Sequence, residues 1–327
     1  MFDFKYNIMY NIDFKAMLIA CALLIILPQT GFSQALEMSR DQLIQFTSKW
    51  EGERFPDGRP KVPDGILERM KKVNIEEAWS VLRNEGYDYQ FERGWKHVHP
   101  GGVLVGRALT TMYMPLRPDV DEEIRKEGKE AGYIGNEVSW PIDMLVPGDV
   151  YVADAWSREP GGVIIGGNLA NSIFSKSGNG VVVDGEVRDL EQLEAIEGFN
   201  SFVRGFNPSY YWSSMLIGIN IPTRIGHATV MPGDVVLGKR EGIVFIPAHL
   251  AEKVVKTAEI VRLKDMFGFQ RLKEGRYTPG QIDPRWSDAI NEEFAVWREY
   301  HSEELPVPKD QIDELLKDRT CSDLPPV

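Results

Sequence analysis

The chain has 327 residues, of which 43% are hydrophobic and 26% are charged, a composition typical of folded globular proteins. This length allows one large domain or two modest ones around a sizeable core. The formal net charge is −12 at pH 7, and the longest basic runs are pairs such as Lys71-Lys72. Because so acidic a chain repels a polyphosphate backbone, the charge argues against nucleic acid as a partner.

Residues 1–35 have the pattern of a signal peptide. Lys15 precedes the apolar run AMLIACALLIILP, which is short for a membrane span and ends at Pro28. The small residues that follow predict cleavage after Ser33 or Ala35. We therefore expect a periplasmic or secreted protein.

Lipidation of Cys21 is an alternative, because Leu18-Ile19-Ala20-Cys21 has the shape of a lipoprotein box. Only five residues separate Lys15 from Cys21, whereas a signal peptide usually has an apolar region of roughly seven to fifteen. Simple cleavage is therefore favoured, and we expect membrane attachment only if Cys21 is lipidated. Cleavage would leave Cys321 as the sole cysteine and would exclude an intrachain disulfide.

The elements predicted in the first half of the remaining chain begin with helices and reach a strand rich in β-branched residues. In chain order they are a helix over 39–50, a loop rich in Gly and Pro, one or two helices over 66–86, a strand over 103–114 and a charged helix over 119–132.

In the second half, strands alternate with helices, which is typical of an α/β fold. The predicted order is a strand over 146–154, a strand, glycine turn and helix over 161–178, a strand over 180–184, a meander of strands over 219–247, an amphipathic helix over 251–275, and short helices near 288–300 and 309–317. The Pro-rich, acidic end of the chain reads as an arm or interface element. A Pro-Gly-Asp turn also occurs twice, before the strands that begin at Val150 and Val235, and hints at two related strand units.

The segment VVVDGEVRDLEQ, residues 181–192, places Arg188 and Asp189 at the end of a strand. One interpretation is a capping box, in which the Asp189 side chain caps a short helix and Gln192 reaches back to it. This interpretation gives Arg188 no role.

Gly166 and Gly167 stand between a predicted strand and a predicted helix. Backbone N–H groups at such a helix start form a ready anion site, although a tight turn would explain the glycines equally well. Taken together, the two segments offer amides, a cation and a carboxylate that can bind metal, each at the exit of a strand, where α/β folds collect their sites.

The spacing of these segments resembles the motif of the RraA-like family. This family holds the regulator of ribonuclease E activity A and the 4-hydroxy-4-methyl-2-oxoglutarate aldolases, which are class II pyruvate aldolases. Its motif is a Gly, twenty residues and then Arg-Asp, and here twenty residues separate Gly167 from Arg188-Asp189. The stretches GRALTTMYMP, SFVRGFNPS and IPTRIGHATVMPGDVVLGKREGIVFIP resemble the neighbouring strands of the family.

The resemblance implies an α/β fold, an RraA-like α/β/β sandwich of the swivelling-domain type, with helical extensions at both ends of the chain. We place an N-terminal extension at 36–72, the RraA-like domain at 73–283 and a C-terminal extension at 284–327. It also implies a homotrimer or hexamer with the site between subunits, completed by an acid from a neighbouring chain. Glu252, Glu259 and Asp265 on the long helix are unranked candidates for that acid.

The resemblance further implies the roles of the site residues. Asp189 would hold Mg²⁺ or Mn²⁺ largely through waters, and Arg188 would contact the keto oxygen of the substrate. The amides around Gly167, Asn168 and Leu169 would bind its carboxylate. Arg188 and Asp189 are thus the expected catalytic residues.

Three positions depart from the pattern of family aldolases. Asn168 and Gln192 stand where those enzymes often carry acids, and Lys239-Arg240 stands where the second Pro-Gly-Asp strand often ends in Asp. The first two departures remove carboxylates that help to hold metal-bound waters.

Other candidate residues have simpler explanations. His97 and His99 have a spacing found in zinc sites, but a loop pair before Pro100 is favoured because no third ligand is evident. His227 reads as a packed or hydrogen-bonded histidine. The aromatic run Tyr210-Tyr211-Trp212 fits either a pocket wall or a trimer contact, and the sequence does not decide between them.

The function that follows is an exported, metal-dependent lyase that cleaves a small 2-keto acid through a pyruvate enolate. The reaction would be retro-aldol cleavage of a 4-hydroxy-2-keto acid, decarboxylation of oxaloacetate, or both. The alternative is a non-catalytic RraA-like binding or regulatory protein.

Overall fold

The computed structural model describes residues 36–156 and 161–301. The predicted signal peptide and the helix expected near 309–317 lie outside these residues. No helix in the described ranges combines the length and apolar character needed to span a membrane.

The longer helices agree with the predicted elements to within a few residues at most ends, whereas the short elements α6, η1 and α10 were not predicted. They are α2 (Arg40–Phe46), α3 (Asp64–Met70), α4 (Ile75–Asn84), α5 (Pro118–Glu130), α6 (Trp140–Asp143), α7 (Gly167–Ser177), α8 (Leu190–Glu194), the 3-10 turn η1 (Ala248–Leu250), α9 (Ala251–Lys273), α10 (Pro279–Ile282) and α11 (Asp288–Tyr300). The strands are β1 (Phe91–Glu92), β2 (Lys96–His97), β3 (Leu104–Pro115), β4 (Asp149–Asp154), β5 (Val181–Val187), β6 (Ser201–Phe206), β7 (Ser214–Ile219), β8 (Thr223–Ile225), β9 (Ala228–Val230), β10 (Val235–Lys239) and β11 (Gly242–Ile246).

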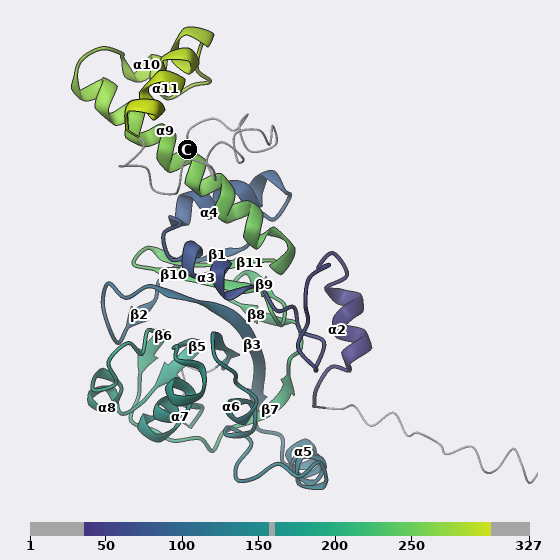
Figure 1. The fold of residues 1–327 in the computed structure, drawn as a ribbon. Coiled ribbons are helices and arrows are strands. Elements are labelled where there is room, and N and C mark those ends of the chain that lie inside the picture. The colour runs from purple at the N-terminus through teal and green to yellow at the C-terminus, as the bar shows by residue number, and fades with distance from the viewer. Residues whose placement is uncertain (1–35, 157–160, 302–327) are drawn as a thin grey trace, which may run out of the picture. The chain divides into compact units, whose positions relative to one another are not determined.

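A mixed sheet forms the centre of the fold (Figure 1). Strands β3, β4, β5 and β6 pair in parallel in that order. The long strand β3 also pairs antiparallel with β10 along its first half and with β7 along its second half. Strands β11 and β1 extend the sheet beyond β10, β2 pairs with β6, and β8 and β9 form a separate hairpin.

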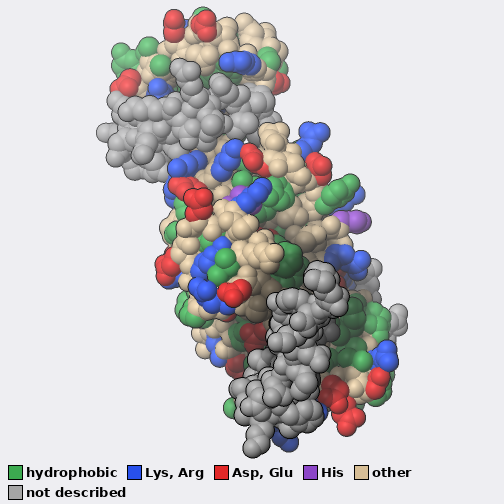
Figure 2. Space-filling view, turned by 90° about the vertical axis from the view of Figure 1, so that its right-hand side faces the viewer, with side chains coloured by type: hydrophobic (Ala, Val, Ile, Leu, Met, Phe, Trp, Pro, Cys, Tyr) green, Lys and Arg blue, Asp and Glu red, His purple; other side chains and the backbone are tan. Residues whose placement is uncertain are grey.

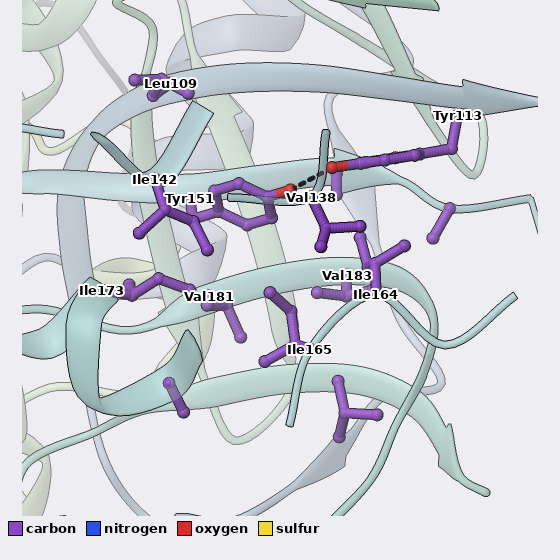
Figure 3. Close-up of a cluster of buried hydrophobic side chains, with 14 of the residues drawn as sticks. Leu109, Tyr113, Val138, Ile142, Tyr151, Ile164, Ile165, Ile173, Val181 and Val183 are labelled. Carbon is purple, nitrogen blue, oxygen red and sulfur yellow. Dashed lines mark hydrogen bonds between the residues drawn. The ribbon is translucent and has the colours of Figure 1, made fainter. Parts of the chain in front are cut away.

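The parallel strands are apolar on both faces, which explains their continuous runs of β-branched residues. In β5, Val181 and Val183 join a core cluster with helices α6 and α7, whereas Val182 joins the cluster on the opposite face. Figure 3 shows the first cluster, in which Tyr151 of β4 lies among aliphatic side chains. Its hydroxyl meets that of Tyr113 at 2.9 Å, so this buried polar pair is satisfied internally.

A second apolar layer covers the other part of the sheet. Strands β10 and β11 pack their outer face against α3, α4 and α9, and their inner face against the β8–β9 hairpin and the parallel strands. This arrangement of helices, parallel sheet and second β layer confirms the predicted α/β/β sandwich with its helical extensions (Figure 1).

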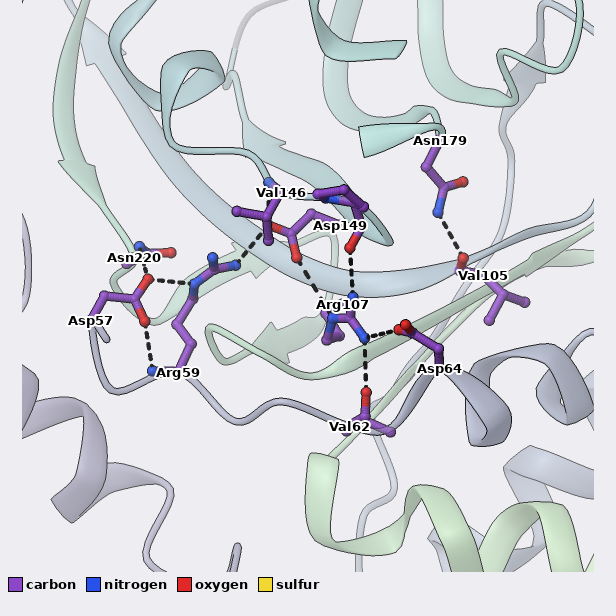
Figure 4. A network of polar contacts seen from close by, with 11 residues as sticks. Asp57, Arg59, Val62, Asp64, Val105, Arg107, Val146, Asp149, Asn179 and Asn220 are labelled. Atoms are coloured by element: carbon purple, nitrogen blue, oxygen red, sulfur yellow. Dashed lines mark hydrogen bonds and ion pairs between the residues drawn. The ribbon is translucent and has the colours of Figure 1, made fainter. Parts of the chain in front are cut away.

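The segment expected to be an N-terminal extension is anchored in the core by Arg59, which is 2% exposed. Its Nη1 donates to Oδ2 of Asp149 at 3.1 Å and its Nε to Oδ2 of Asp57 at 2.7 Å. Arg107 of β3 reaches the same segment through Asp64, at 2.7 Å. Figure 4 shows this network between the loop and the sheet, and it makes the loop an integral part of the fold.

The end of the described chain packs on itself. Helices α10 and α11 fold back on the second half of α9, where Phe267, Trp286, Phe294 and Trp297 form an aromatic cluster. This cluster explains why the acidic sequence still forms helices, because Ile290, Phe294 and Trp297 lie on one buried face of α11.

Acidic and basic side chains are mixed on the face of the molecule in Figure 2, outside the part that grey atoms cover. The uncovered part of this face therefore presents no broad basic surface of the kind that attracts polyphosphates. The exclusion of nucleic acid stays a prediction from composition.

The two Pro-Gly-Asp turns have the same local geometry. Asp149 accepts a hydrogen bond from the amide of Val146 at 3.2 Å, and Asp234 accepts one from the amide of Met231 at 2.8 Å. Each carboxylate thus closes its own turn three residues back, which is why Asp is required at this position. The two carboxylates differ in their surroundings. Asp149 forms an ion pair with Arg59, whereas burial raises the pKa of Asp234 to about 7.

We expect Asp234 to make the protein less stable as pH rises from about 4 to about 7. The folded-state pKa of Asp234 lies above its ordinary value, so in this window the folded chain holds a proton that the unfolded chain releases. The contribution of Asp234 to the free energy of unfolding therefore falls with pH, by at most about 1.4 kcal/mol per pH unit. Urea unfolding of wild type and Asp234→Asn at several pH values tests this, and equal slopes for the two proteins would contradict it.

One predicted strand is wrong. Residues 161–165 are buried but belong to no strand, and Gly161 lies in a turn with φ 95°. The carbonyl of Ile165 instead accepts a hydrogen bond from the amide of Arg188 at 3.0 Å. The strand was predicted from apolar character alone. The apolar side chains of this segment instead pack beneath the site described below.

Candidate active site

Arg188 and Asp189 follow directly after β5, at the carboxyl ends of the parallel strands. Asp189 has left-handed backbone angles, φ 60° and ψ 44°, which Asp tolerates better than most residues. Its side chain makes no capping hydrogen bond to α8. The capping-box interpretation of Asp189 and Gln192 is therefore wrong, because the left-handed turn directs the carboxylate away from the start of the helix.

The Asp189 carboxylate instead binds the other half of the motif. The amide of Gly167 donates to Oδ2 of Asp189 at 3.0 Å. Helix α7 spans 11 residues and β5 spans 7, so the chain runs along the helix and returns along the strand to the level where it began. The twenty residues between Gly167 and Arg188 form this helix, the returning strand and the turn between them, and their combined length accounts for the spacing of the motif.

The two glycines allow the segments to approach closely. A Cβ on Gly166 would lie 2.6 Å from Oδ2 of Asp189 and 2.7 Å from Nε of Arg188. A Cβ on Gly167 would lie 1.8 Å from Oε1 of Gln192. Side chains at either position would displace the site groups, so a close approach rather than an unusual φ requires glycine here.

The first turn of α7 supplies free backbone donors. The amide of Gly167 is used by Asp189, and that of Ala170 donates to the carbonyl of Gly166 at 2.9 Å. The amides of Asn168 and Leu169 donate to no acceptor among the described residues. Both residues line a cavity, so these two amides and the helix dipole favour an anion there.

That cavity has a volume of about 440 Å³ and brings together every predicted substrate-binding segment. Asn168, Leu169, Arg188, Asp189 and Gln192 all line it, and Gly167 lies directly behind them. The remaining lining residues are Asn136, Val138, Val163, Ile164, Ile165, Gly166, Tyr210 and Tyr211. Two members of the aromatic run thus form a cavity wall, while Trp212 packs beside Gly161.

The wall opposite the motif rests on a buried acid that the sequence analysis missed. Glu137 is fully buried, and its Oε1 accepts hydrogen bonds from the Tyr211 hydroxyl at 2.9 Å and from Arg125 at 3.1 Å. Burial raises the pKa of Glu137, and burial together with this carboxylate raises that of Tyr211. No sequence pattern marks Glu137, because its partners come from distant segments.

Asp189 is the one carboxylate among the described residues that line the cavity. Its Oδ2 receives the Gly167 amide and lies 3.5 Å from Nε of Arg188, which leaves Oδ1 without a partner among those residues. The described ranges contain no group of three or more His, Cys, Asp or Glu side chains placed to hold a metal. One carboxylate suits a hard cation such as Mg²⁺, which keeps several waters, but does not suit a metal held by protein ligands alone.

The histidines take no part in this site. The ring nitrogens of His99 contact the carbonyls of Phe199 at 2.8 Å and Glu194 at 3.0 Å, and the His97 ring packs edge-on against Phe202. His227 forms a 2.9 Å contact with Glu92. His227 is thus hydrogen-bonded, as expected, whereas the loop predicted for both members of the His97 and His99 pair is wrong for His97, which lies in β2 and pairs with Phe202 of β6.

Two of the acids on α9 that were candidates to complete the site have partners within their own chain. Glu259 accepts two hydrogen bonds from Arg69, at 2.6 and 2.8 Å, and Glu252 pairs with Lys256 at 2.8 Å. Asp265 is partly buried, and burial raises its pKa. Lys239, at the end of β10, does not line the cavity described above.

The fold and the cavity define an α/β protein whose site combines helix-start amides with an Arg-Asp pair at the end of a parallel strand. A sequence model of the RraA-like family, described as Aldolase/RraA, matches residues 72–245. The chain belongs to the RraA-like family.

The chain spans about half the length of the curated relatives it matches. A Halalkalibacterium halodurans protein, provisionally named as a 4-hydroxy-4-methyl-2-oxoglutarate aldolase, is 31% identical over 113 residues, which are 35% of this chain and 53% of that protein. An uncharacterized protein of Methanocaldococcus jannaschii is 29% identical over 111 residues, 34% of this chain and 53% of its own length.

Solved structures share the fold. RraAS2 of Streptomyces coelicolor, described as an unusual member of the RNase ES inhibitor RraA family, has a TM-score of 0.55 at 24% identity and covers 64% of this chain and 100% of its own. An uncharacterized protein from Pseudomonas syringae pv. tomato has a TM-score of 0.56 at 21% identity, covering 71% and 98%. The family holds both aldolases and non-catalytic regulators, so the choice between them depends on the site.

Proposed function

We propose that this protein is a divalent-metal-dependent carbon–carbon lyase that releases pyruvate from a small 2-keto acid. The observation that carries the proposal is the convergence of Arg188, Asp189 and two free amides of α7 on one cavity of about 440 Å³.

Backbone amides and Arg188 of this chain match the carboxylate and the 2-keto oxygen that all such acids share. The free amides of Asn168 and Leu169 would receive the carboxylate, as helix starts commonly do. Arg188, half-exposed beside the same cavity, would donate to the 2-keto oxygen and hold it in plane with the carboxylate. The substrate would thus be fixed at two adjacent oxygens.

In a retro-aldol step the C4 hydroxyl loses its proton and the bond between C3 and C4 breaks. The electron pair of that bond forms the C2–C3 double bond of pyruvate enolate, and C3 then takes up a proton to give pyruvate. Arg188 faces the oxygen on which negative charge develops, and a water hydrogen-bonded to the free oxygen of Asp189 would receive the C4 proton.

A bound Mg²⁺ or Mn²⁺ would supply Lewis-acid polarisation of the keto group at this place. Asp189 would hold the cation, largely through waters. Since Asn168 and Gln192 are neutral, we expect the cation to be held weakly by the protein alone and more tightly when a 2-keto acid is present.

The direct test is pyruvate release by purified protein with added Mn²⁺, measured against oxaloacetate and a panel of 4-hydroxy-2-keto acids. The background is the same reaction with Mn²⁺ and no protein, because oxaloacetate decarboxylates spontaneously. Metal-dependent release above this background supports the lyase. No release from any member of the panel would leave a non-catalytic binding or regulatory protein, which Asn168 and Gln192 favour.

We expect Asn168→Asp to tighten Mn²⁺ binding by about tenfold, because it adds a second carboxylate beside the cavity. Mn²⁺ titration followed by electron paramagnetic resonance or calorimetry measures the affinity directly. Asn84→Asp on the exposed face of α4 makes the same change of charge away from the cavity and should leave the affinity unchanged. Equal affinities of wild type and Asn168→Asp would exclude a metal at Asp189.

Export and assembly are proposed on the sequence pattern and the family resemblance alone. We expect the mature protein to begin after Ser33 or Ala35 and to be recovered from the periplasm or medium. We also expect a trimer or hexamer, to be measured by light scattering on the purified protein.

A further inference from the structure

The cavity has two walls of different chemistry. One wall is the motif, held together by the hydrogen bond between Gly167 and Asp189. The other comes from Asn136, Val138, Tyr210 and Tyr211, and it is held from behind by the hydrogen bond between Tyr211 and the buried Glu137. The proposed function uses only the first wall.

The second wall presents two tyrosine rings, Val138 and the neutral polar side chain of Asn136 to the cavity. The Tyr211 hydroxyl donates to buried Glu137 at 2.9 Å, so it is engaged behind the wall. The Tyr211 ring also packs edge-on against Tyr113, with 6.1 Å between centroids, which fixes its position. Val138 and Val163 continue the apolar surface, and Tyr210, 63% exposed, forms the rim.

Among the described residues that line the cavity, charged side chains occur only on the motif wall. Arg188 is the one cationic side chain among the described residues that line the cavity, and the proposed function commits it to the keto acid end. Arg125 lies behind the second wall but is paired with Asp121 at 2.8 Å and Glu137 at 3.1 Å. A second substrate carboxylate would therefore meet the two tyrosine rings, Val138 and the neutral side chain of Asn136 rather than a cation, with the buried Glu137 behind them, which is unfavourable.

We infer that the ligand of this cavity is a 2-keto acid with a single carboxylate and an apolar or aromatic substituent on C4. This inference rests on the proposed function for the orientation of the keto acid. It deepens that function, because cleavage of such a compound gives pyruvate and an apolar aldehyde. A cavity of about 440 Å³ has room for that substituent, since pyruvate alone has only six heavy atoms.

Binding can be tested without turnover, using two 2-keto acids that lack the C4 hydroxyl and so cannot undergo retro-aldol cleavage. We expect 2-oxo-4-phenylbutanoate to bind at least about tenfold more tightly than 2-oxoglutarate, which carries a carboxylate in place of the phenyl group. Calorimetry with the full-length mature protein and Mn²⁺ measures both affinities. Equal affinities, tighter binding of 2-oxoglutarate, or binding of neither compound would overturn the inference.

A charge placed on the second wall should reverse the preference. We expect Tyr210→Lys to shift the ratio of the two affinities toward 2-oxoglutarate by about tenfold, because it supplies the missing cation. Tyr89→Lys, at a position 72% exposed that does not line the cavity, adds the same charge and should leave the ratio unchanged. An unchanged ratio in Tyr210→Lys would show that the ligand does not reach this wall.

These measurements separate the inference from the proposed function. Selective binding without pyruvate release from the matching 4-hydroxy-2-keto acids would keep the ligand class and reject the lyase. Pyruvate release with a preference for a C4 carboxylate would keep the lyase and reject the ligand class.

Discussion

Replacing Arg188 by Ala should lower kcat for pyruvate release by about 100- to 1000-fold while leaving the folded protein intact. A donor aimed at developing oxyanion charge commonly contributes this much. The stability should not change, because the Arg188 side chain is 40% exposed and lies 3.5 Å from Asp189, a geometry in which surface pairs contribute little. A coupled assay for pyruvate and thermal unfolding measure the two effects separately.

Arg117→Ala is the matched control for this experiment. The Arg117 side chain is 70% exposed and pairs with Asp119 on the surface at 2.9 Å, outside the cavity. The variant removes the same kind of side chain from a more exposed pair that does not line the cavity, so kcat and the unfolding temperature should both stay at wild-type values. Unfolding of Arg188→Ala would show that Arg188 serves the structure, and full activity in the folded variant would show that the reaction does not need it.

The largest loss of stability is expected for Arg59→Met. This change leaves Asp149, whose side chain is fully buried, without its 3.1 Å partner. Burial already raises the pKa of Asp149, and Arg59 is the strongest influence that opposes the rise. Removing one member of a buried pair typically costs roughly 3–5 kcal/mol, so the urea midpoint should fall markedly at pH 7.

Lys61→Met is the control, because it breaks a pair with Glu53 whose side chains are 41% and 71% exposed, and it should change stability by less than about 1 kcal/mol. After Arg59→Met, the cationic contact left to Asp149 is the longer one with Arg107, at 3.8 Å. The double variant Arg59→Met with Asp149→Asn removes the buried negative charge and should recover part of the loss. A loss below about 1 kcal/mol in Arg59→Met alone would mean that residues 36–72 are not anchored through Arg59.

Much of the fold could be predicted from the sequence, because its signals are local. The β-branched run at Val181–Val183 and the apolar period of α9 reflect backbone preference and burial along a single element. The strand expected over 161–165 was predicted from the same kind of local signal and is wrong. Apolar character reports burial, but hydrogen-bond pairing depends on which neighbour lies alongside.

The site was predictable only as far as the motif extends. Arg188 and Asp189 and the amides of residues 167–169 lie together because a helix and a returning strand have fixed lengths, which sequence spacing records. No sequence spacing marks the residues of the second wall. Glu137, Tyr211 and Arg125 come from separate segments, and only their packing against one another makes a cavity wall.

The sequence by itself determined the α/β character, the family motif and the pairing of a cation with a carboxylate at a strand end. Only the tertiary structure decided what Asp189 does with its oxygens. Local pattern favoured a helix cap, whereas the left-handed turn and the approach of Gly167 direct the carboxylate across to α7. The physical reason is that a cap needs only neighbours in sequence, whereas a site is assembled from contacts between residues that the fold brings together.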